Sequence, residues 1–467
     1  MDKILKEIFH YDSFRQGQQE IIEQILANKD VLAILPTGNG KSLCYQYPAY
    51  VRSGLVVIIC PLISLMNDQI EQMQLRGEKR AIAFNSQLTY QEKKEVLRNL
   101  SSYRFFFISP ELIRQEEVLA TLKKIEIQSI VVDEAHCISQ WGVDFRPDYY
   151  QLPYILESLG QPQVIALTAT ATPTVIADIR TILFAKKNPV EIQYSVYRSN
   201  LHYLVEKEVD KRKYIIDFLE KYAGPGIIYF SSKKEAQKMA LELKQLGYAA
   251  AYYHGDMMTE DRLKIQQQFL QNQLEILCAT TAFGMGVNKP NIRFVIHYHL
   301  PASLENFVQE SGRAGRDGKP ALSILLYKEE DISLQRLFIR EAYQELFDLF
   351  IVDPKWQSDL QKRWLHCLQD IGYQKEDFIR LFKKKEKERY QQLRAMVEFV
   401  ETPYSRIQFI QRYFAEPQVF QYEQEKVAID DILESRRESL TQPQEFSARH
   451  ILYQLFQPML EKTEKTT

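Results

Sequence analysis

Residues 31–42, VLAILPTGNGKS, join an apolar, β-branched run to a glycine-rich turn, and a helical pattern follows. In this order the glycines let consecutive backbone N–H groups turn toward phosphate oxygens, and the helix N-terminus favours anions. Lys41 would reach the β- and γ-phosphates, and the Ser42 hydroxyl would hold Mg²⁺. The segment therefore predicts a nucleoside triphosphate site made by Thr37, Gly38, Asn39, Gly40, Lys41 and Ser42. Leu35 stands where the strict P-loop pattern has glycine.

Apolar runs of strand length recur along the chain in two series. The first comprises residues 31–35, 55–60, 105–109, 130–133 and 164–168, and the second 226–230, 250–253, 276–279, 294–298 and 323–327. The runs lack strict alternation, which is typical of parallel strands buried on both faces. With helical patterns between them, they predict an α/β fold with two tandem parallel-sheet domains. We expect domains at residues 1–200 and 201–330, with Tyr197–Leu201 as the linker, and a helical region at 331–467.

Length and composition fit this organisation. A chain of 467 residues predicts about three domains, and 45% hydrophobic content supports well-buried cores. The net charge of −2 argues against a wholly basic nucleic-acid-coating protein but allows a local basic groove. We expect an intracellular, cytoplasmic protein, because the N-terminal pattern is that of an amphipathic helix and no apolar run approaches a membrane span. The five cysteines show neither zinc nor redox spacing and should be reduced core residues.

Two acids follow directly on the apolar run that ends at Val132: Asp133 and Glu134, in the sequence DEAH. An acid at the carboxyl end of a strand in the P-loop sheet can hold the Mg²⁺ that Ser42 also contacts. The neighbouring Glu134 can orient and polarise the attacking water. Together with the P-loop, this pair predicts an NTPase.

The second series contains residues 309–318, QESGRAGRDG. We expect Arg313 and Arg316, three apart on a helix start, to face the same side. A guanidinium near a γ-phosphate stabilises transition-state charge, so both residues are candidate arginine fingers that close the cleft from the opposite domain. In isolation, a surface Arg-Asp turn is the alternative.

Taken together, these motifs resemble the RecQ-type DNA helicases of helicase superfamily 2. The resemblance covers roughly residues 5 to 335 and continues weakly to about 433. It implies two RecA-like domains, ATP and Mg²⁺ as cofactors, and single-stranded and branched duplex DNA as partners. It also implies 3′-to-5′ translocation and a role in DNA repair or recombination. We expect a monomer without membrane association, and protein partners such as a single-strand-binding protein stay open.

The resemblance assigns further residues near the nucleotide. Tyr11, Arg15 and Gln18 match the family's adenine-binding motif, in which the Tyr and Arg flank the base and the Gln hydrogen-bonds its edge. Residues 133–147, DEAHCISQWGVDFRP, resemble the fused ATP-binding motif and aromatic-rich loop that sense single-stranded DNA. Trp141 and Phe145 there could stack on bases, with charge from Arg146. The alternative is that these aromatics are core residues, but the Gly and Pro of this segment favour a loop.

Four shorter segments resemble family motifs Ia (60–69), III (166–171), IV (229–232) and V (279–290). With the aromatic-rich loop, they give candidate DNA-binding or coupling residues Ser64, His136, Trp141, Phe145, Arg146, Thr168, Thr170, Ser231 and Thr280. Hydroxyls at strand ends suit successive phosphates of one strand, but they also commonly cap helices.

The C-terminal region departs from the family. Ser405, Lys426, Ile429 and Ile432 align with the four cysteine ligands of its zinc subdomain. Structural zinc needs four N or S donors, so we expect no zinc, with an apolar contact of Ile429 and Ile432 in its place. We expect no winged helix or C-terminal accessory domain after Leu433. The segment 375–394 has a local charge of +4, which indicates either a solvated helix face or a contact with phosphates.

Two alternatives to a DNA helicase remain open at this point. One is an RNA-directed helicase of the same superfamily, since tandem α/β cores also serve RNA. The other is a DNA translocase or remodelling factor that moves along DNA with little strand separation, which the altered zinc region favours.

Overall fold

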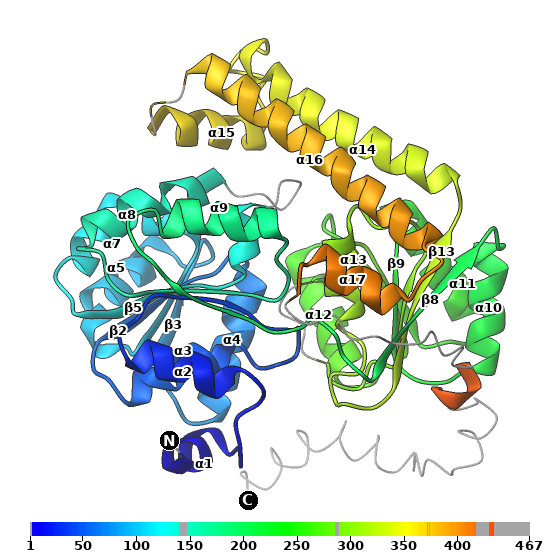
Figure 1. Ribbon diagram of the computed structural model, residues 1–467, viewed down its shortest axis with the longest axis horizontal. Helices are drawn as coiled ribbons and strands as arrows, with labels where there is room; N and C mark the ends of the chain where they lie inside the picture. Colours follow the sequence, from blue (N-terminus) through cyan, green and yellow to red (C-terminus); the bar gives the residue numbers. More distant parts are fainter. Residues whose placement is uncertain are drawn as a thin grey trace, which may run out of the picture.

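Two parallel β-sheets, each covered by helices, lie side by side, and a pair of long helices crosses over both (Figure 1). The computed structural model describes residues 2–139, 147–284, 289–370, 372, 374–416 and 429–433. The predicted fold class, two tandem parallel-sheet domains followed by helices, is confirmed.

The first sheet has seven parallel strands in the order β3-β4-β2-β5-β6-β1-β7. They are β1 (Val31–Ile34), β2 (Leu55–Ile59), β3 (Ala81–Phe84), β4 (Phe105–Ile108), β5 (Ile127–Val132), β6 (Val164–Thr168) and β7 (Val190–Gln193). One face packs on α2 (Gln18–Leu26), α3 (Ser42–Gln46) and α4 (Ile63–Leu75), with α1 (Asp2–Phe9) beside them. The other packs on α5 (Tyr90–Arg98), α6 (Pro110–Ile113), α7 (Glu116–Leu122), α8 (Leu152–Ser158) and α9 (Pro173–Leu183).

The second sheet has six parallel strands in the order β10-β11-β9-β12-β13-β8. They are β8 (Leu201–Lys207), β9 (Gly226–Tyr229), β10 (Ala250–Tyr253), β11 (Ile276–Ala279), β12 (Phe294–His297) and β13 (Ala321–Tyr327). Its helices are α10 (Lys211–Lys221), α11 (Lys233–Gln245), α12 (Thr259–Leu270) and α13 (Leu304–Ser311). The chain passes from one sheet to the other through residues 194–200.

Strand and helix boundaries follow from local chemistry. Every residue of β1, β2 and β4 is buried, as the unbroken apolar runs predict. Helix α5 begins with a capping box in which the Thr89 side chain accepts from the Glu92 amide and the Glu92 side chain accepts from the Thr89 amide. Helices α9, α10 and α11 begin with side-chain caps from Thr172, Asp210 and Ser232.

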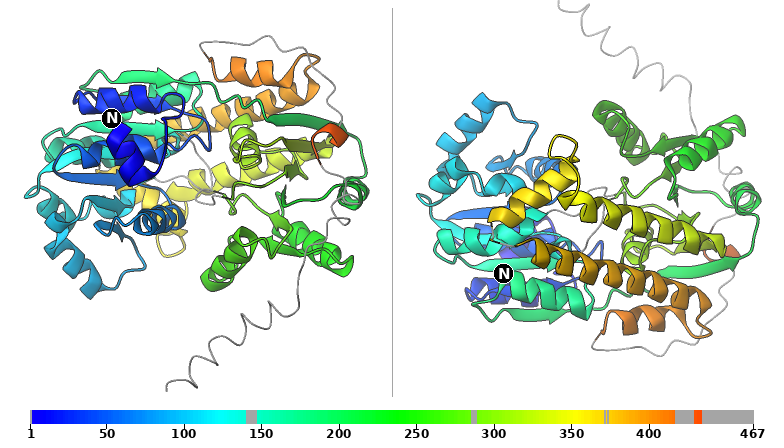
Figure 2. Two further views of the ribbon diagram at one scale, coloured as in Figure 1. Left: turned by 90° about the horizontal axis from the view of Figure 1, so that it is seen from below. Right: turned by 90° about the horizontal axis from the view of Figure 1, so that it is seen from above.

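Helices α14 (Glu330–Phe347), α15 (Asp359–Asp370) and α16 (Lys375–Glu401) form what we call the helical arm. It leaves the second domain after β13, reaches over the first domain and returns (Figure 1; Figure 2, right). Its aromatic core of Trp364, Phe378 and Phe382 is continuous with residues of the second domain such as Phe307. The arm therefore belongs structurally to the second domain.

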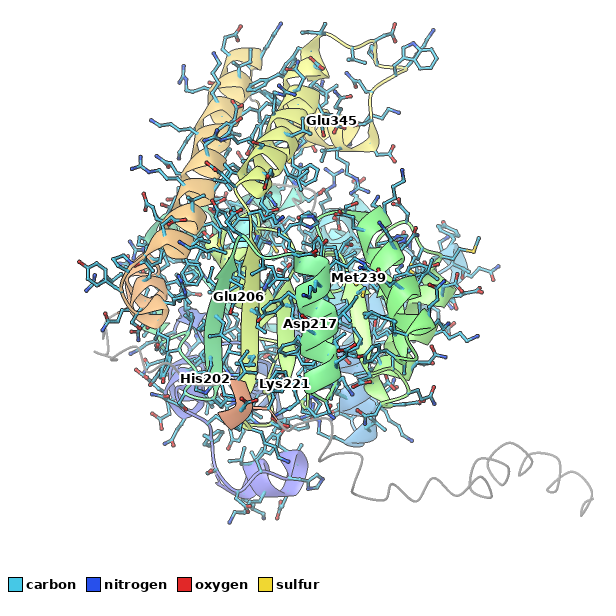
Figure 3. The ribbon with its side chains drawn as sticks, turned by 90° about the vertical axis from the view of Figure 1, so that its right-hand side faces the viewer. His202, Glu206, Asp217, Lys221, Met239 and Glu345 are labelled. Atoms are coloured by element: carbon cyan, nitrogen blue, oxygen red, sulfur yellow. The ribbon has the colours of Figure 1, made fainter. Side chains whose placement is uncertain are left out.

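The last described segments return to the second domain. Helix α17 (Arg406–Tyr413) follows the arm, and the short helix η6 (Ile429–Asp431) lies beside Lys221, which is labelled in Figure 3. Ile429 and Ile432 pack against the apolar cluster that includes Phe218 and Phe294. An apolar contact of these two residues is thus present, made with the second domain rather than with the segment around Ser405. The expected absence of zinc stays a prediction.

All five cysteines are buried free thiols. Within the part of the chain described here, no helix has the length and apolar character needed to cross a membrane.

Candidate active site

A cleft of about 350 Å³ lies between the two sheet domains and collects most of the predicted nucleotide residues. The first domain lines it with the P-loop, Asp133 and Glu134, and the second with Pro290, Gln309, Arg313 and Arg316. A ligand bound here would contact both domains at once.

The glycine-rich turn sits between β1 and α3. Gly38 and Gly40 have φ angles of 83° and 69°, in the left-handed region that glycine adopts without strain. Lys41 precedes the first residue of α3, and its Nζ lies 3.7 Å from Glu134 Oε1. The loop thus has the strand, turn and helix context that phosphate binding requires.

The residues expected to read adenine already hold the P-loop. Gln18 is buried, and its Nε2 donates to the carbonyl oxygens of Asn39 at 2.8 Å and Gly40 at 3.1 Å. Its Oε1 accepts from the Arg15 amide, and the Arg15 guanidinium donates to the Gly38 carbonyl. Tyr11 is 46% exposed at the cleft edge, where it could stack on a base. In this arrangement Gln18 supports the loop and does not offer a free amide to a base.

The acidic pair is placed by β5, which neighbours β2 and β6 in the middle of the sheet. Glu134 has a φ of 49°, an uncommon value for a non-glycine residue that aims its carboxylate at Lys41. Its other oxygen lies 3.2 Å from Nδ1 of His136, and that nitrogen is 2.8 Å from Oγ1 of Thr168. The Thr168 hydroxyl also donates to the Thr170 carbonyl. These contacts connect the acidic pair to the segment after β6.

The pKa values of the two neighbouring acids, Asp133 and Glu134, are shifted in opposite directions. Burial and then the neighbouring Glu134 charge raise the pKa of Asp133 to about 6. Burial opposes ionisation of Glu134 too, but Lys41 and His136 outweigh it and lower the pKa of Glu134 to about 2. Glu134 therefore stays ionised at neutral pH, which the water-orienting role predicted for it requires.

The donor set fits Mg²⁺. Asp133 is a buried carboxylate beside a second carboxylate, which favours a cation, and the Ser42 hydroxyl lines the same cleft. No group of three or more His, Cys, Asp or Glu side chains placed to hold a metal occurs in the described ranges. A magnesium ion here would depend on the nucleotide phosphates for its remaining ligands.

The two arginines reach the cleft, but not from a helix start as expected. Helix α13 ends at Ser311, and Arg313 and Arg316 lie in the turn that follows it. The Arg316 side chain lies against Gly38, so that a Cβ added there would be 3.4 Å from its Cγ. Burial, then Arg313 and Arg198, lower the pKa of Arg316 to about 10, which keeps it protonated.

Gly312 brings the domains into direct contact. Its carbonyl accepts from Thr37 Oγ1 at 3.4 Å, and an added Cβ would lie 2.1 Å from that oxygen. An alanine here would overlap the Thr37 hydroxyl, so either the Thr37 side chain or one of the two segments would have to move.

The candidate DNA-binding and coupling residues divide into three groups. His136, Thr168 and Thr170 are buried beside Glu134. Ser64 is exposed near the start of α4, while Ser231 and Thr280 follow the adjacent strands β9 and β11 at one edge of the second sheet. Trp141, Phe145 and Arg146 lie outside the described residues. The roles of all nine stay predictions.

Sequence reasoning missed several residues that line the cleft or lie at the carboxyl edge of the second sheet. One stripe of α4 together with its C-cap residue lines the cleft: Leu65, Asp68, Gln69, Gln72 and the C-cap Arg76. Its spacing of three and four residues is the signal that could have identified it. At the edge of the second sheet, His254 follows β10, and His299 accepts from the Ser231 amide at 3.2 Å. The signal for these was a polar residue within two positions of the end of an apolar strand run.

Comparison with known proteins identifies the family to which this chain belongs. Residues 15–179 match the DEAD/DEAH box helicase family and residues 210–318 match the helicase conserved C-terminal domain. The chain is 46% identical over 379 residues to the probable ATP-dependent DNA helicase RecS of Bacillus subtilis, covering 80% of this chain and 76% of RecS. It is 39% identical to the ATP-dependent DNA helicase RecQ of the same organism, covering 77% of this chain and 60% of that protein.

Solved structures share the fold at low identity. The Mycobacterium smegmatis helicase Lhr, bound to single-stranded DNA and AMP-PNP, aligns with a TM-score of 0.58 and 18% identity. The alignment covers 72% of this chain and 49% of Lhr. The sequence relatives carry the assignment: the chain belongs to the RecQ-type family of superfamily 2 helicases.

Proposed function

We propose that this chain is an ATP-dependent DNA helicase that translocates 3′ to 5′ on single-stranded DNA and separates duplex strands in repair or recombination. One observation carries the enzymatic part. A single cleft holds the P-loop lysine and the acidic pair of one domain opposite two arginines of the other. Names of the relatives supply the DNA substrate, and the chain spans less than two thirds of RecQ.

The residues divide the work of hydrolysis. Lys41 and the backbone amides of the P-loop bind the triphosphate. The Thr37 hydroxyl donates a hydrogen bond to the Gly312 carbonyl across the cleft. Glu134, held ionised by Lys41 and His136, orients and polarises the attacking water. Mg²⁺ held by Ser42 and Asp133 would supply charge neutralisation when bound.

The second domain completes the site. Arg313 and Arg316 add positive charge where the γ-phosphate would develop negative charge. Because these groups come from two domains, ATP binding favours a closed cleft and hydrolysis releases it. Repeated closure would move Ser64, near the start of α4, and Thr280, directly after β11, relative to one another along one DNA strand.

A forked-duplex assay tests the proposal. We expect ATP-dependent unwinding of a DNA fork with a 3′ tail, less with a 5′ tail, and ATPase activity stimulated by single-stranded DNA. Lys41→Ala should abolish both, whereas Lys94→Ala, an exposed lysine of α5, should leave them unchanged. DNA-stimulated ATPase without unwinding would point to a translocase, and preference for the same fork in RNA to an RNA helicase.

A further inference from the structure

The helical arm makes a second bridge between the domains, away from the ATP cleft. At one end α16 packs on α13, the helix that runs into the arginine turn. The rings of Phe399 and Phe307 lie 5.1 Å apart, and Gln392 donates to Glu305 at 3.3 Å. The arm is therefore fixed to the part of the second domain that carries Arg313 and Arg316.

At its other end the arm contacts the first domain through a buried lysine. Lys385 is 3% exposed, and its Nζ lies 2.9 Å from Asp178 Oδ2 of α9. The same ammonium donates to the Ser139 carbonyl at 3.4 Å and pairs with Glu388 of its own helix at 2.9 Å. Ser139 Oγ donates to Asp178 at 2.6 Å, so Lys385 and Ser139 both contact the Asp178 carboxylate. This lysine does not lie on a solvated face, as one interpretation of the basic segment supposed.

The contacted residues lie close to the acidic pair in the fold. Ser139 directly follows the short helix η3 (Ala135–Ile138), which carries His136. His136 in turn contacts Glu134 and Thr168. Helix α9, which carries Asp178, follows the strand end at Thr168. Lys385 thus holds both segments that support the catalytic carboxylate.

A second set of contacts with the first domain comes from α15, the helix of the arm that precedes α16. Cys367 Sγ donates to the Pro147 carbonyl at 2.9 Å in a buried position. Asp370 accepts from Gln151 at 2.8 Å and pairs with Arg114 at 3.3 Å. The arm therefore meets the first domain both before and after residues 140–146.

We propose that Lys385 is a positioning residue for ATP hydrolysis, fixing through the helical arm the placement of the Glu134 segment relative to the arginine turn. The inference rests on the hydrolysis proposed for the cleft. It goes beyond the cleft because none of Lys385, Asp178 or Asp370 lines it. The arm contacts given above involve neither the P-loop nor α2, so the arm should act on turnover and not on ATP binding.

The test is steady-state ATP hydrolysis by the full chain with saturating single-stranded DNA. We expect Lys385→Met, which keeps the alkyl stem, to lower kcat at least fivefold while KM for ATP changes less than twofold. Asp178→Asn should have a similar effect. The kcat of the double variant should be no lower than the kcat of the less active single variant. Lys384→Met is the matched control, because this neighbour is exposed and, among the described residues, its ion pair is with Glu388 of its own helix and not with the first domain.

Several outcomes would overturn the inference. They are a kcat within twofold of wild type in Lys385→Met and Asp178→Asn, additive losses in the double variant, or an equal loss in Lys384→Met. Should Lys385→Met fail to fold, Asp370→Asn at a 44% exposed side chain tests the second contact set. A folded Asp370→Asn protein should lose at least threefold in kcat, and an unchanged kcat would count against the arm. Lack of DNA-stimulated ATPase in the wild type would instead refute the proposed function.

Discussion

The two bridges between the domains, the ATP cleft and the arm contact, are built on opposite principles. In the cleft, Arg313 is 4% exposed and its Nε has no hydrogen-bond partner among the described residues. At the arm contact, the ammonium of Lys385 has two carboxylates and a carbonyl around it. The cleft therefore has a buried donor, Arg313 Nε, that is available to a ligand. At the arm contact, the Lys385 ammonium finds its partners within the protein.

This difference separates a working surface from a supporting one. A buried donor without a partner costs about 1–3 kcal/mol, so it persists where a ligand can supply the missing acceptor. A buried lysine paired on both sides needs no ligand, and removing one partner leaves a charge uncompensated. We therefore expect variants in the cleft to affect the chemical step most strongly, and variants in residues that shape or support the cleft to have graded effects.

The largest effect should come from Glu134→Gln. The amide cannot polarise water, so we expect kcat to fall by about 10²–10⁴-fold while the protein still binds ATP. Single-turnover hydrolysis and equilibrium binding of a fluorescent ATP analogue measure the two quantities separately. Glu157→Gln, at an exposed carboxylate of α8, is the control. A kcat within tenfold of wild type would remove Glu134 from the chemical step.

Burial explains which parts of the fold could be predicted from the sequence. Interior strands such as β2 and β4 are unbroken apolar runs because both of their faces are covered. The three strands without a predicted run, β3, β7 and β8, all lie at sheet edges. Partial exposure gives β7 and β8 mixed sequences, VEIQ and LHYLVEK, which local patterns do not distinguish from loops.

The candidate site was predictable where spacing along the chain carries the chemistry. Lys41, Asp133 and Arg316 come from recognisable motifs, and the structure brings them into one cleft, although their roles stay predictions. The burial of Lys385 could not be anticipated, because its partner Asp178 lies 207 positions away and only tertiary packing brings them together. The turn that carries Arg313 was expected as a helix start because the local pattern does not show that α13 ends at Ser311.

Gly312→Ala should give an intermediate effect and tests whether the domains must touch in the cleft. The new Cβ would overlap the Thr37 hydroxyl, a packing strain of about 1–3 kcal/mol, or about 5- to 150-fold in kcat/KM for ATP. Adding Thr37→Ala removes the overlapping oxygen and should recover part of the loss. Gly255→Ala, where the nearest atom would be 3.9 Å away, should have little effect. Unchanged kcat/KM in Gly312→Ala would mean that the contact opens during the cycle without cost.

The smallest effect should come from Gln18→Ala, which removes support behind the P-loop without touching a catalytic group. Its side chain donates to the Asn39 and Gly40 carbonyls, two bonds with a combined net value of about 1–2 kcal/mol. We expect KM for ATP to rise about 5- to 30-fold with kcat within threefold, and Gln19→Ala on the exposed face of α2 to leave both unchanged.

Measuring GTP in parallel distinguishes the two roles of the Gln18 amide. An equal loss for ATP and GTP indicates support of the loop, because both nucleotides share the phosphates that the loop binds. A loss confined to ATP would mean that the amide leaves the loop and pairs with adenine once the nucleotide is bound.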